Sequence, residues 1–346
     1  MEQIKFGYDR AYFGAANGYS GFRSQFGEIF NSHNMEKLYI LKGGPGTGKS
    51  TLLKRILADK RYEGCYKEAV FCSSDPASLD GVILSREGRK IAVLDGTAPH
   101  ERDAVIPGAV DELINLGDGF DIGLLTSRRD KIKELIEKKK SAYKRAYLHL
   151  SVAGSMSQAI NAICLENGYY SEAEMDVLER HKSNRHEELG ATTLLYTSAF
   201  CSRGYHKIEY LPPDGCKRIG VGGDGIREYI MMQKIIESLP KSVIREIHAS
   251  PLSDKKIERI ITDDACYEVS DSAHDIYFSC CDRSDKALKQ MLDMHNGALD
   301  MAKAEFEHAS GHHFALEEIY SKAMQFTVCD AALEKITAGI DKALRI

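Results

Sequence analysis

The stretch GGPGTGKST, residues 43–51, has the residue types and the spacing of a phosphate-binding loop. Its glycines can take positive φ without a side-chain penalty, so successive backbone N–H groups can turn inward around phosphate oxygens. Lys49 is expected to reach the β- and γ-phosphates, and the Ser50 hydroxyl is expected to bind Mg²⁺. The residues expected to contact the nucleotide are Gly43, Gly44, Pro45, Gly46, Thr47, Gly48, Lys49, Ser50 and Thr51.

A loop of this kind needs a strand before it and a helix after it. The apolar run LYIL at 38–41 predicts the strand, and the periodicity of 49–57 predicts the helix. The unpaired N–H groups and the positive dipole end of that helix would face the bound phosphate. The flanking pattern therefore supports the phosphate-binding interpretation.

Asp95 is the candidate for the carboxylate that holds the water shell of Mg²⁺. It ends the apolar run KIAVLD at 90–95, which predicts a buried strand that places Asp95 at the carboxyl edge of the sheet. Asp75 is the competing candidate, and a turn at Asp95 and Gly96 is the alternative interpretation.

The catalytic base is a separate question, because Gly96 follows Asp95 where many P-loop ATPases have Glu. The loop APHERD offers Glu101, with His100 and Asp103 as alternatives. We take Glu101 as the catalytic candidate. A solvated or loop-stabilising role is the other interpretation of each of the three residues.

The remaining apolar runs predict an α/β fold. Strands are expected at 68–72 and 120–125, and their alternation with helices favours a parallel sheet of the P-loop NTPase type. From Ser127 to about His186 the pattern becomes that of long helices. The first domain is therefore predicted to span 1–186, with a helical subdomain at about 127–186.

The second half repeats the first in order, which predicts a tandem duplication. Residues 195–205 align without gaps on 12–22, and residues 218–235 align on 39–56. The second domain, 187–346, is expected to be a degenerate P-loop-like domain with C-terminal helices. Its loop lacks the critical residues, because Gly48, Lys49 and Ser50 are matched by Arg227, Glu228 and Tyr229.

Three segments together resemble a family of bacterial P-loop ATPases of similar length that are built from two P-loop halves. The segments are LKGGPGTGKSTLLKRI, CSSDPASLDGVI and DGTAPHERDAVIPGAVDELINLG. The resemblance covers nearly all of the first half and implies nucleotide binding by the loop and an α/β sheet in each half. Members can carry an intact loop in the second half, and this chain departs from that pattern at 227–229.

Composition describes a globular protein. The 346 residues are 43% apolar and 28% charged, with a formal net charge of −5 that gives no global sign of nucleic-acid binding. No apolar run approaches the length of a membrane span, and the N-terminus lacks the apolar core of a signal peptide. We expect a cytoplasmic protein that does not bind membranes.

One stretch is strongly basic, although the chain as a whole carries a net negative charge. Residues 128–145 hold nine basic and three acidic residues, a local net charge of +6. A solvated helix face is the favoured interpretation. A nucleic-acid contact or a lid over phosphates, as in nucleotide kinases, are the alternatives.

The sequence thus predicts a Mg-ATP-binding P-loop ATPase with one working nucleotide site and with ATP and Mg²⁺ as its ligands. Two alternatives use the same loop. A small-molecule or nucleotide kinase would pass the phosphate to an acceptor, and a non-enzymatic switch would change shape for a protein partner. The sequence does not identify that acceptor or partner.

Overall fold

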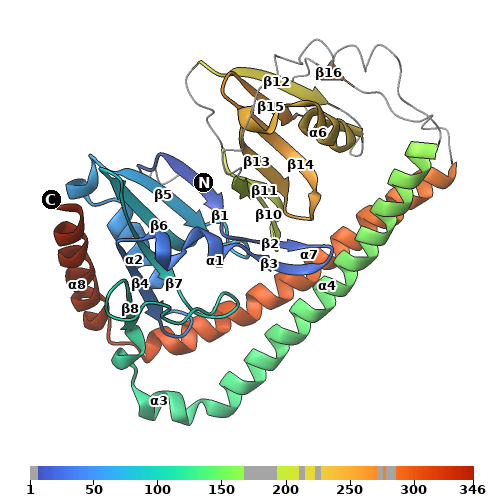
Figure 1. The fold of residues 1–346 in the computed structure, drawn as a ribbon. Coiled ribbons are helices and arrows are strands. Elements are labelled where there is room, and N and C mark those ends of the chain that lie inside the picture. The colour runs from blue at the N-terminus through green and yellow to red at the C-terminus, as the bar shows by residue number, and fades with distance from the viewer. Residues whose placement is uncertain (1–6, 167–192, 210–214, 223–226, 271–275, 278–285) are drawn as a thin grey trace.

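The computed structural model describes residues 7–166, 193–209, 215–222, 227–270, 276–277 and 286–346. The chain is an α/β protein whose described residues form two six-stranded mixed sheets, two small hairpins and two long helices that run beside them (Figure 1). No closed barrel is formed by these strands.

The first sheet contains the strands that were predicted around the loop. Strands at 38–41, 68–72 and 90–95 are confirmed as β4, β5 and β7. The sheet order is β1-β5-β6-β7-β4-β8. The bounds are β1 Arg10–Phe13, β4 Lys37–Lys42, β5 Tyr66–Phe71, β6 Leu79–Arg86, β7 Arg89–Asp95 and β8 Asp111–Asn115.

The predicted parallel sheet is a mixed sheet with parallel and antiparallel pairs. Strand β6 runs antiparallel to both β5 and β7, whereas the other neighbouring pairs are parallel. The reason is local, because only Glu87 and Gly88 connect β6 to β7, and both have positive φ, 50° and 76°. A two-residue turn of this kind can join only antiparallel strands.

The strand predicted at 120–125 is wrong, because this segment enters helix α3, Ile122–Ser127. The Asp121 carboxylate caps the helix by accepting a hydrogen bond of 2.9 Å from the Leu124 N–H. The apolar residues are not buried as a central strand requires, since Ile122 is 67% exposed. The last strand of the sheet is instead β8, which the sequence did not predict.

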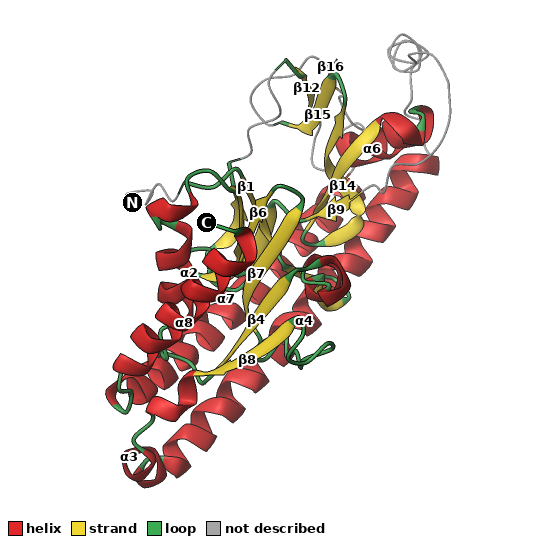
Figure 2. Cartoon of the chain, turned by 60° about the vertical axis from the view of Figure 1, so that its left-hand side comes forward, coloured by secondary structure: helices red, strands yellow, loops and turns green. Residues whose placement is uncertain are grey.

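Two helices cover one face of the first sheet, one from the first sixty residues and one from the C-terminus. The predicted helix at 49–57 is confirmed as α2, Lys49–Leu57, and it shares an apolar core with α8, Thr327–Leu344 (Figure 2). Leu53, Ile336 and Ile340 are fully buried in this core. The C-terminal helix therefore packs beside the helix that follows the loop. The remaining short elements here are α1 Phe26–Ile29, η1 Ser32–Asn34, η2 Lys60–Tyr62 and η3 Leu116–Gly119.

Two long antiparallel helices pack along each other and connect the halves: α4, Arg129–Glu166, and α7, Lys286–Lys322 (Figure 1). Apolar side chains from both helices form shared clusters, one around Leu135 and Leu316 and another around Leu150 and Phe306. The predicted helical character after Ser127 is confirmed as far as residue 166. The rest of that prediction, to about 186, lies outside the described residues.

The second sheet repeats the strand order of the first. Read from β9, its order is β9-β13-β14-β15-β12-β16, and each neighbouring pair has the same relative direction as its counterpart in the first sheet. The bounds are β9 Thr193–Leu195, β12 Lys217–Gly222, β13 Ile244–Ser250, β14 Ser253–Thr262, β15 Ala265–Val269 and β16 Ile276–Tyr277. Helices α6, Arg227–Ser238, and η4, Lys241–Val243, belong to this half.

The halves meet through residues that the sequence alignment places on each other. Phe13 aligns with Tyr196, and the Phe13 N–H donates a hydrogen bond of 2.8 Å to the Tyr196 carbonyl. Asn17 aligns with Phe200, and the Asn17 side chain donates to the Phe200 carbonyl at 3.1 Å. Contact between equivalent positions is the pattern of a two-fold interface. The hairpins at this contact are β2 Ala15–Gly18 with β3 Gly21–Ser24, and β10 Ser198–Cys201 with β11 Gly204–Lys207.

Candidate functional site

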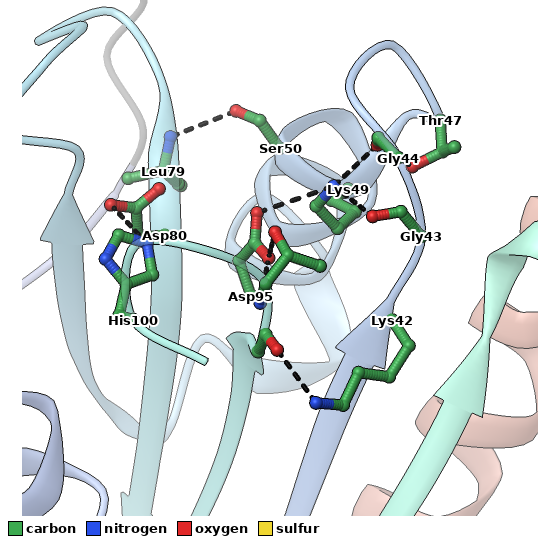
Figure 3. A network of polar contacts seen from close by, with 12 residues as sticks. Lys42, Gly43, Gly44, Thr47, Lys49, Ser50, Leu79, Asp80, Asp95 and His100 are labelled. Atoms are coloured by element: carbon green, nitrogen blue, oxygen red, sulfur yellow. Dashed lines mark hydrogen bonds and ion pairs between the residues drawn. The ribbon is translucent and has the colours of Figure 1, made fainter. Parts of the chain in front are cut away.

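The glycine-rich loop joins the end of β4 to the start of α2 (Figure 3). Gly46 and Gly48 have φ of 70° and 85°, a region that side chains other than glycine rarely adopt. Gly48 is the residue before the helix, and Lys49 is its first residue. A Cβ at Gly46 would lie 2.6 Å from the backbone oxygen of Glu317. Conformation and space therefore both require glycine in this loop.

Lys49 connects the loop to the carboxyl end of β7. Its buried ammonium donates hydrogen bonds to the carbonyl oxygens of Gly44 at 2.8 Å and Gly43 at 3.4 Å. The same nitrogen lies 3.6 Å from Oδ2 of Asp95 (Figure 3). The structure thus brings together two predicted site residues that are far apart in the sequence.

The hydroxyl groups of the loop have different neighbours. Ser50 Oγ accepts a hydrogen bond of 3.0 Å from the Leu79 N–H, so it lies at the first residue of β6. The buried Thr47 hydroxyl donates to the Gly44 carbonyl at 2.9 Å and holds the loop closed. Thr51 is exposed on α2. Ser50 is therefore the loop hydroxyl that contacts strand β6.

Asp95 has one carboxylate oxygen occupied and one directed at the loop. Oδ1 accepts hydrogen bonds from the Thr97 N–H at 2.9 Å and from the Thr97 hydroxyl at 2.6 Å. Oδ2 faces only the Lys49 ammonium among the described residues. The short bonds to Thr97 fix the carboxylate in an orientation that leaves Oδ2 toward the loop.

The donor set fits magnesium that arrives with a nucleotide. Ser50 and Asp95 supply a hydroxyl and a carboxylate oxygen, the hard ligands that Mg²⁺ prefers. Within the described ranges, no group of three or more His, Cys, Asp or Glu residues is placed to hold a metal by itself. Mg²⁺ in nucleotide sites is usually held by one or two protein ligands, with phosphates and water completing its octahedron.

Asp80 is a site residue that the sequence analysis did not identify. It follows Leu79, lies in β6 and is 5% exposed (Figure 3). The β5–β6 ladder pairs Val70 with Gly81 and Phe71 with Leu79, so Asp80 is the extra residue of a β-bulge. A carboxylate inside the run LDGVIL was the available signal, because an unpaired acid is rare in a buried strand.

His100 is the partner of Asp80. Its Nε2 lies 3.4 Å from Asp80 Oδ2, and its ring stacks on Phe26 with a centroid separation of 4.1 Å. Burial lowers the pKa of His100 to about 4. Burial also raises the pKa of Asp80 to about 8, and the charge of Asp95 adds to this rise. At neutral pH the pair is therefore uncharged in the absence of ligands.

The raised pKa of Asp80 predicts a specific pH dependence of stability. Between the unfolded value, about 3.9, and the folded value the native state holds a proton that the unfolded chain lacks, so stability falls as pH rises. We expect Asp80→Asn to remove up to about 1.4 kcal/mol per pH unit from this slope. Urea unfolding of both proteins in Mg-free buffer between pH 6.5 and 8 measures it, because unfolded His100 titrates in both proteins alike and the difference between their slopes reports Asp80.

Asp300→Asn is the matched control, because Asp300 is exposed on α7. That variant should keep the slope of the unaltered protein. An unchanged slope in Asp80→Asn would mean that the Asp80 carboxyl is already ionised at pH 6.5, and would contradict the assignment.

The other two candidate residues of the APHERD loop lie at the surface. Glu101, the predicted catalytic candidate, is exposed. Asp103 is also exposed, and it forms an ion pair of 3.3 Å with Lys42. His100 is the buried member of the three, and it is the one that the structure places beside Asp80 and near Asp95.

The corresponding region of the second half has different chemistry. Arg227, the counterpart of Gly48, is the first residue of α6, so its backbone is helical. Glu228, the counterpart of Lys49, is buried, and its charge stabilises the charged form of Lys256. Gly220, the counterpart of Leu41, pairs with Glu268 as Leu41 pairs with Asp95, and Glu268 forms an ion pair of 3.0 Å with Arg259. Residues 223–226 of this loop, including Gly223 and Gly225 of the predicted match, lie outside the described residues.

Comparison with protein-family models, curated proteins and solved structures finds no match for this chain. In the part of the chain that the structure describes, no helix has both the length and the apolar character needed to cross a bilayer.

Proposed function

We propose that this protein is a Mg-ATP-dependent P-loop ATPase with one nucleotide site, formed by residues 43–51. The observation that carries the proposal is the position of the Lys49 ammonium. It lies at the start of α2, within the glycine loop, and 3.6 Å from a carboxylate at the end of the adjacent parallel strand. Phosphoryl transfer needs a cation, a helix N-terminus and a metal-binding carboxylate close together.

The fold belongs to the same proposal. We assign 1–186 to a P-loop NTPase-type domain and 187–346 to a degenerate copy that arose by tandem duplication. The identical strand order of the two sheets, with the same relative directions, supports the duplication. The β-bulges support it further. Each leaves one acidic residue without a partner in the strand ladder, and these residues, Asp80 and Glu258, lie at corresponding places in β6 and β14.

In the proposed reaction a water molecule attacks the terminal phosphorus of ATP, the bond to the leaving ADP oxygen breaks, and a proton leaves the water. The loop N–H groups and Lys49 bind the phosphates and stabilise the charge that develops on them. Ser50 and Asp95 would hold Mg²⁺, which neutralises phosphate charge when bound. Asp80 is the nearby buried group that, in its ionised form, can accept a proton from the attacking water.

The second half should bind no nucleotide. Glu228 would place an anion where Lys49 places a cation, and Glu268, which the ladder register places where Asp95 lies, is paired with Arg259. We therefore expect calorimetric titration with a non-hydrolysable ATP analogue and Mg²⁺ to give one site per chain. Two sites per chain would contradict the assignment of the second half as degenerate.

Two other functions use the same site, and ADP release separates them from hydrolysis. ADP release without any added acceptor supports an ATPase. Release that requires a small molecule or a nucleotide indicates a kinase, and tight binding without release under either condition indicates a switch for a protein partner. The buried Asp80 favours hydrolysis, because its ionised form would supply the base that is missing after Asp95.

A further inference from the structure

Helix α7 packs directly on the glycine loop. The backbone of Glu317 leaves no room for a side chain at Gly46, where a Cβ would lie 2.6 Å from the Glu317 oxygen. One turn further on, the Tyr320 ring lies 3.1 Å from the position of a Cβ on Gly44. The loop is therefore bordered by a helix from the end of the chain, and not only by its own strand and helix.

Helix α4 presents a second set of residues to the same region. Leu135, Lys139 and Tyr143 follow one another at intervals of four and so share one face of the helix. Leu135 packs with Leu316, the residue before Glu317. The Tyr143 hydroxyl donates to Ser74 Oγ at 3.2 Å, on the turn between β5 and β6. Lys139 lies between these two contacts, which places it beside the loop.

Lys139 differs from its neighbours in the basic stretch. Lys138 and Lys140 are exposed, whereas Lys139 is half-buried. Burial lowers the pKa of Lys139, the charge of Glu317 opposes this, and the charge of Lys49 adds to the lowering. Lys139 forms no ion pair within 4 Å in the described part of the chain. Its ammonium is therefore held near a second ammonium with incomplete compensation.

Glu317 is the anion that this arrangement contains. Its carboxylate lies 3.5 Å from His313, and hydrogen bonding to His313 lowers the pKa of Glu317. The charge of Lys49 and hydrogen bonding by the Gly46 N–H lower that pKa further. Glu317 thus interacts with two groups, a loop N–H and the Lys49 ammonium, that phosphate oxygens would use.

We propose that Lys139 is a phosphate-binding residue of this site, that it contacts the terminal phosphate of a bound nucleoside triphosphate, and that Glu317 is the anion it faces until the nucleotide binds. This rests on the proposed function. A bound triphosphate would compete with Glu317 for the Gly46 N–H and Lys49. It would also bring a negative charge to Lys139, which forms no ion pair within 4 Å among the described residues.

The proposal gives Lys139 a specific task, which is to distinguish a triphosphate from a diphosphate. The loop N–H groups contact the α- and β-phosphates, which both nucleotides possess. Lys49 contacts the β-phosphate as well as the γ-phosphate. A lysine that approaches from another helix adds a contact that only the terminal phosphate can make. One hydrogen bond to a charged group corresponds to about ten- to a hundredfold in affinity.

The test is calorimetric titration of the full chain with adenylyl imidodiphosphate and, separately, with ADP, both with Mg²⁺. We expect Lys139→Met to weaken binding of the triphosphate analogue about ten- to a hundredfold and binding of ADP less than about twofold. Lys139→Arg should restore most of the loss, because it restores the charge. Lys140→Met, which alters an exposed neighbour, should bind both nucleotides like the unaltered protein. Retained ADP binding also shows that the Lys139→Met site is folded.

Glu317→Gln provides an independent readout. Removing the competing charge should strengthen binding of the triphosphate analogue several-fold, whereas Glu318→Gln should have no effect, because Glu318 is exposed and paired with Lys322. The proposal is overturned if Lys139→Met weakens both nucleotides equally, or neither, while Lys49→Ala still removes binding. If Lys49→Ala also leaves binding unchanged, the proposed nucleotide site itself is wrong.

Discussion

Lys49→Ala is expected to lower the affinity for a Mg²⁺-bound ATP analogue by about ten- to a hundredfold, and to reduce hydrolysis to the background rate. The ammonium is buried at the start of α2 and donates to the loop carbonyls, so it is positioned before any ligand arrives. Alanine removes both the charge and the donor, and no described residue of the loop carries a second cation. Calorimetry measures the binding, and ADP release measures the reaction.

The matched control for this variant is Lys60→Ala. Lys60 is exposed beyond the C-terminal end of α2, and its loss should change neither affinity nor rate. Melting temperatures of both variants show whether the fold is retained. Undiminished analogue binding by a folded Lys49→Ala protein would refute the site.

Asp95→Asn is expected to reduce Mg²⁺-dependent hydrolysis about a hundredfold or more, the scale of losing one preorganised electrostatic contact, while nucleotide affinity falls much less. Asparagine can still accept the hydrogen bonds from Thr97, so the turn after β7 should persist. The loss of charge acts on the oxygen that faces Lys49 and would hold the metal. ADP release across a Mg²⁺ titration measures the effect.

Asp75→Asn is the informative comparison, because Asp75 is the rival carboxylate in the sequence. It accepts a hydrogen bond from the Ala77 N–H and forms an ion pair of 3.2 Å with Arg203, and no contact joins it to the loop among the described residues. We expect near-normal hydrolysis. A large loss in this variant together with a mild one in Asp95→Asn would move the metal to Asp75.

Local pattern was sufficient for the elements around the loop. The strand before it, α2 and the strand that ends at Asp95 are each defined by a short apolar run next to a distinctive turn, and all three were predicted. The antiparallel insertion of β6 was missed, because strand direction depends on the two-residue turn at Glu87 and Gly88 and on the neighbours that β6 finds. The short apolar run at 120–125 fits a strand or a helix equally well, and the cap at Asp121 decided it.

The site residues also divide into those that the sequence predicts and those that it does not. Lys49 and Ser50 follow from spacing, and Asp95 follows from its place at the end of a strand. Asp80, Lys139 and Glu317 come from three separate segments, and only the packing of β6, α4 and α7 brings them to the loop. Sequence spacing carries no information about such contacts.

Because α7 is long, a small tilt at one end of the helix produces a larger displacement at the other end. At ~1.5 Å per residue its 37 residues span ~55 Å, and the loop touches it near its C-terminal end, at Glu317. A tilt of only ~5° about Glu317 would sweep the far end through ~4 Å, given ~46 Å of helix between them. The middle of the helix, around Phe306, bears on the β10–β11 hairpin of the second half. Phe306 lies ~16 Å from Glu317 along the helix, so the same tilt would displace this contact by ~1.4 Å and would transmit a change at the loop to the second half.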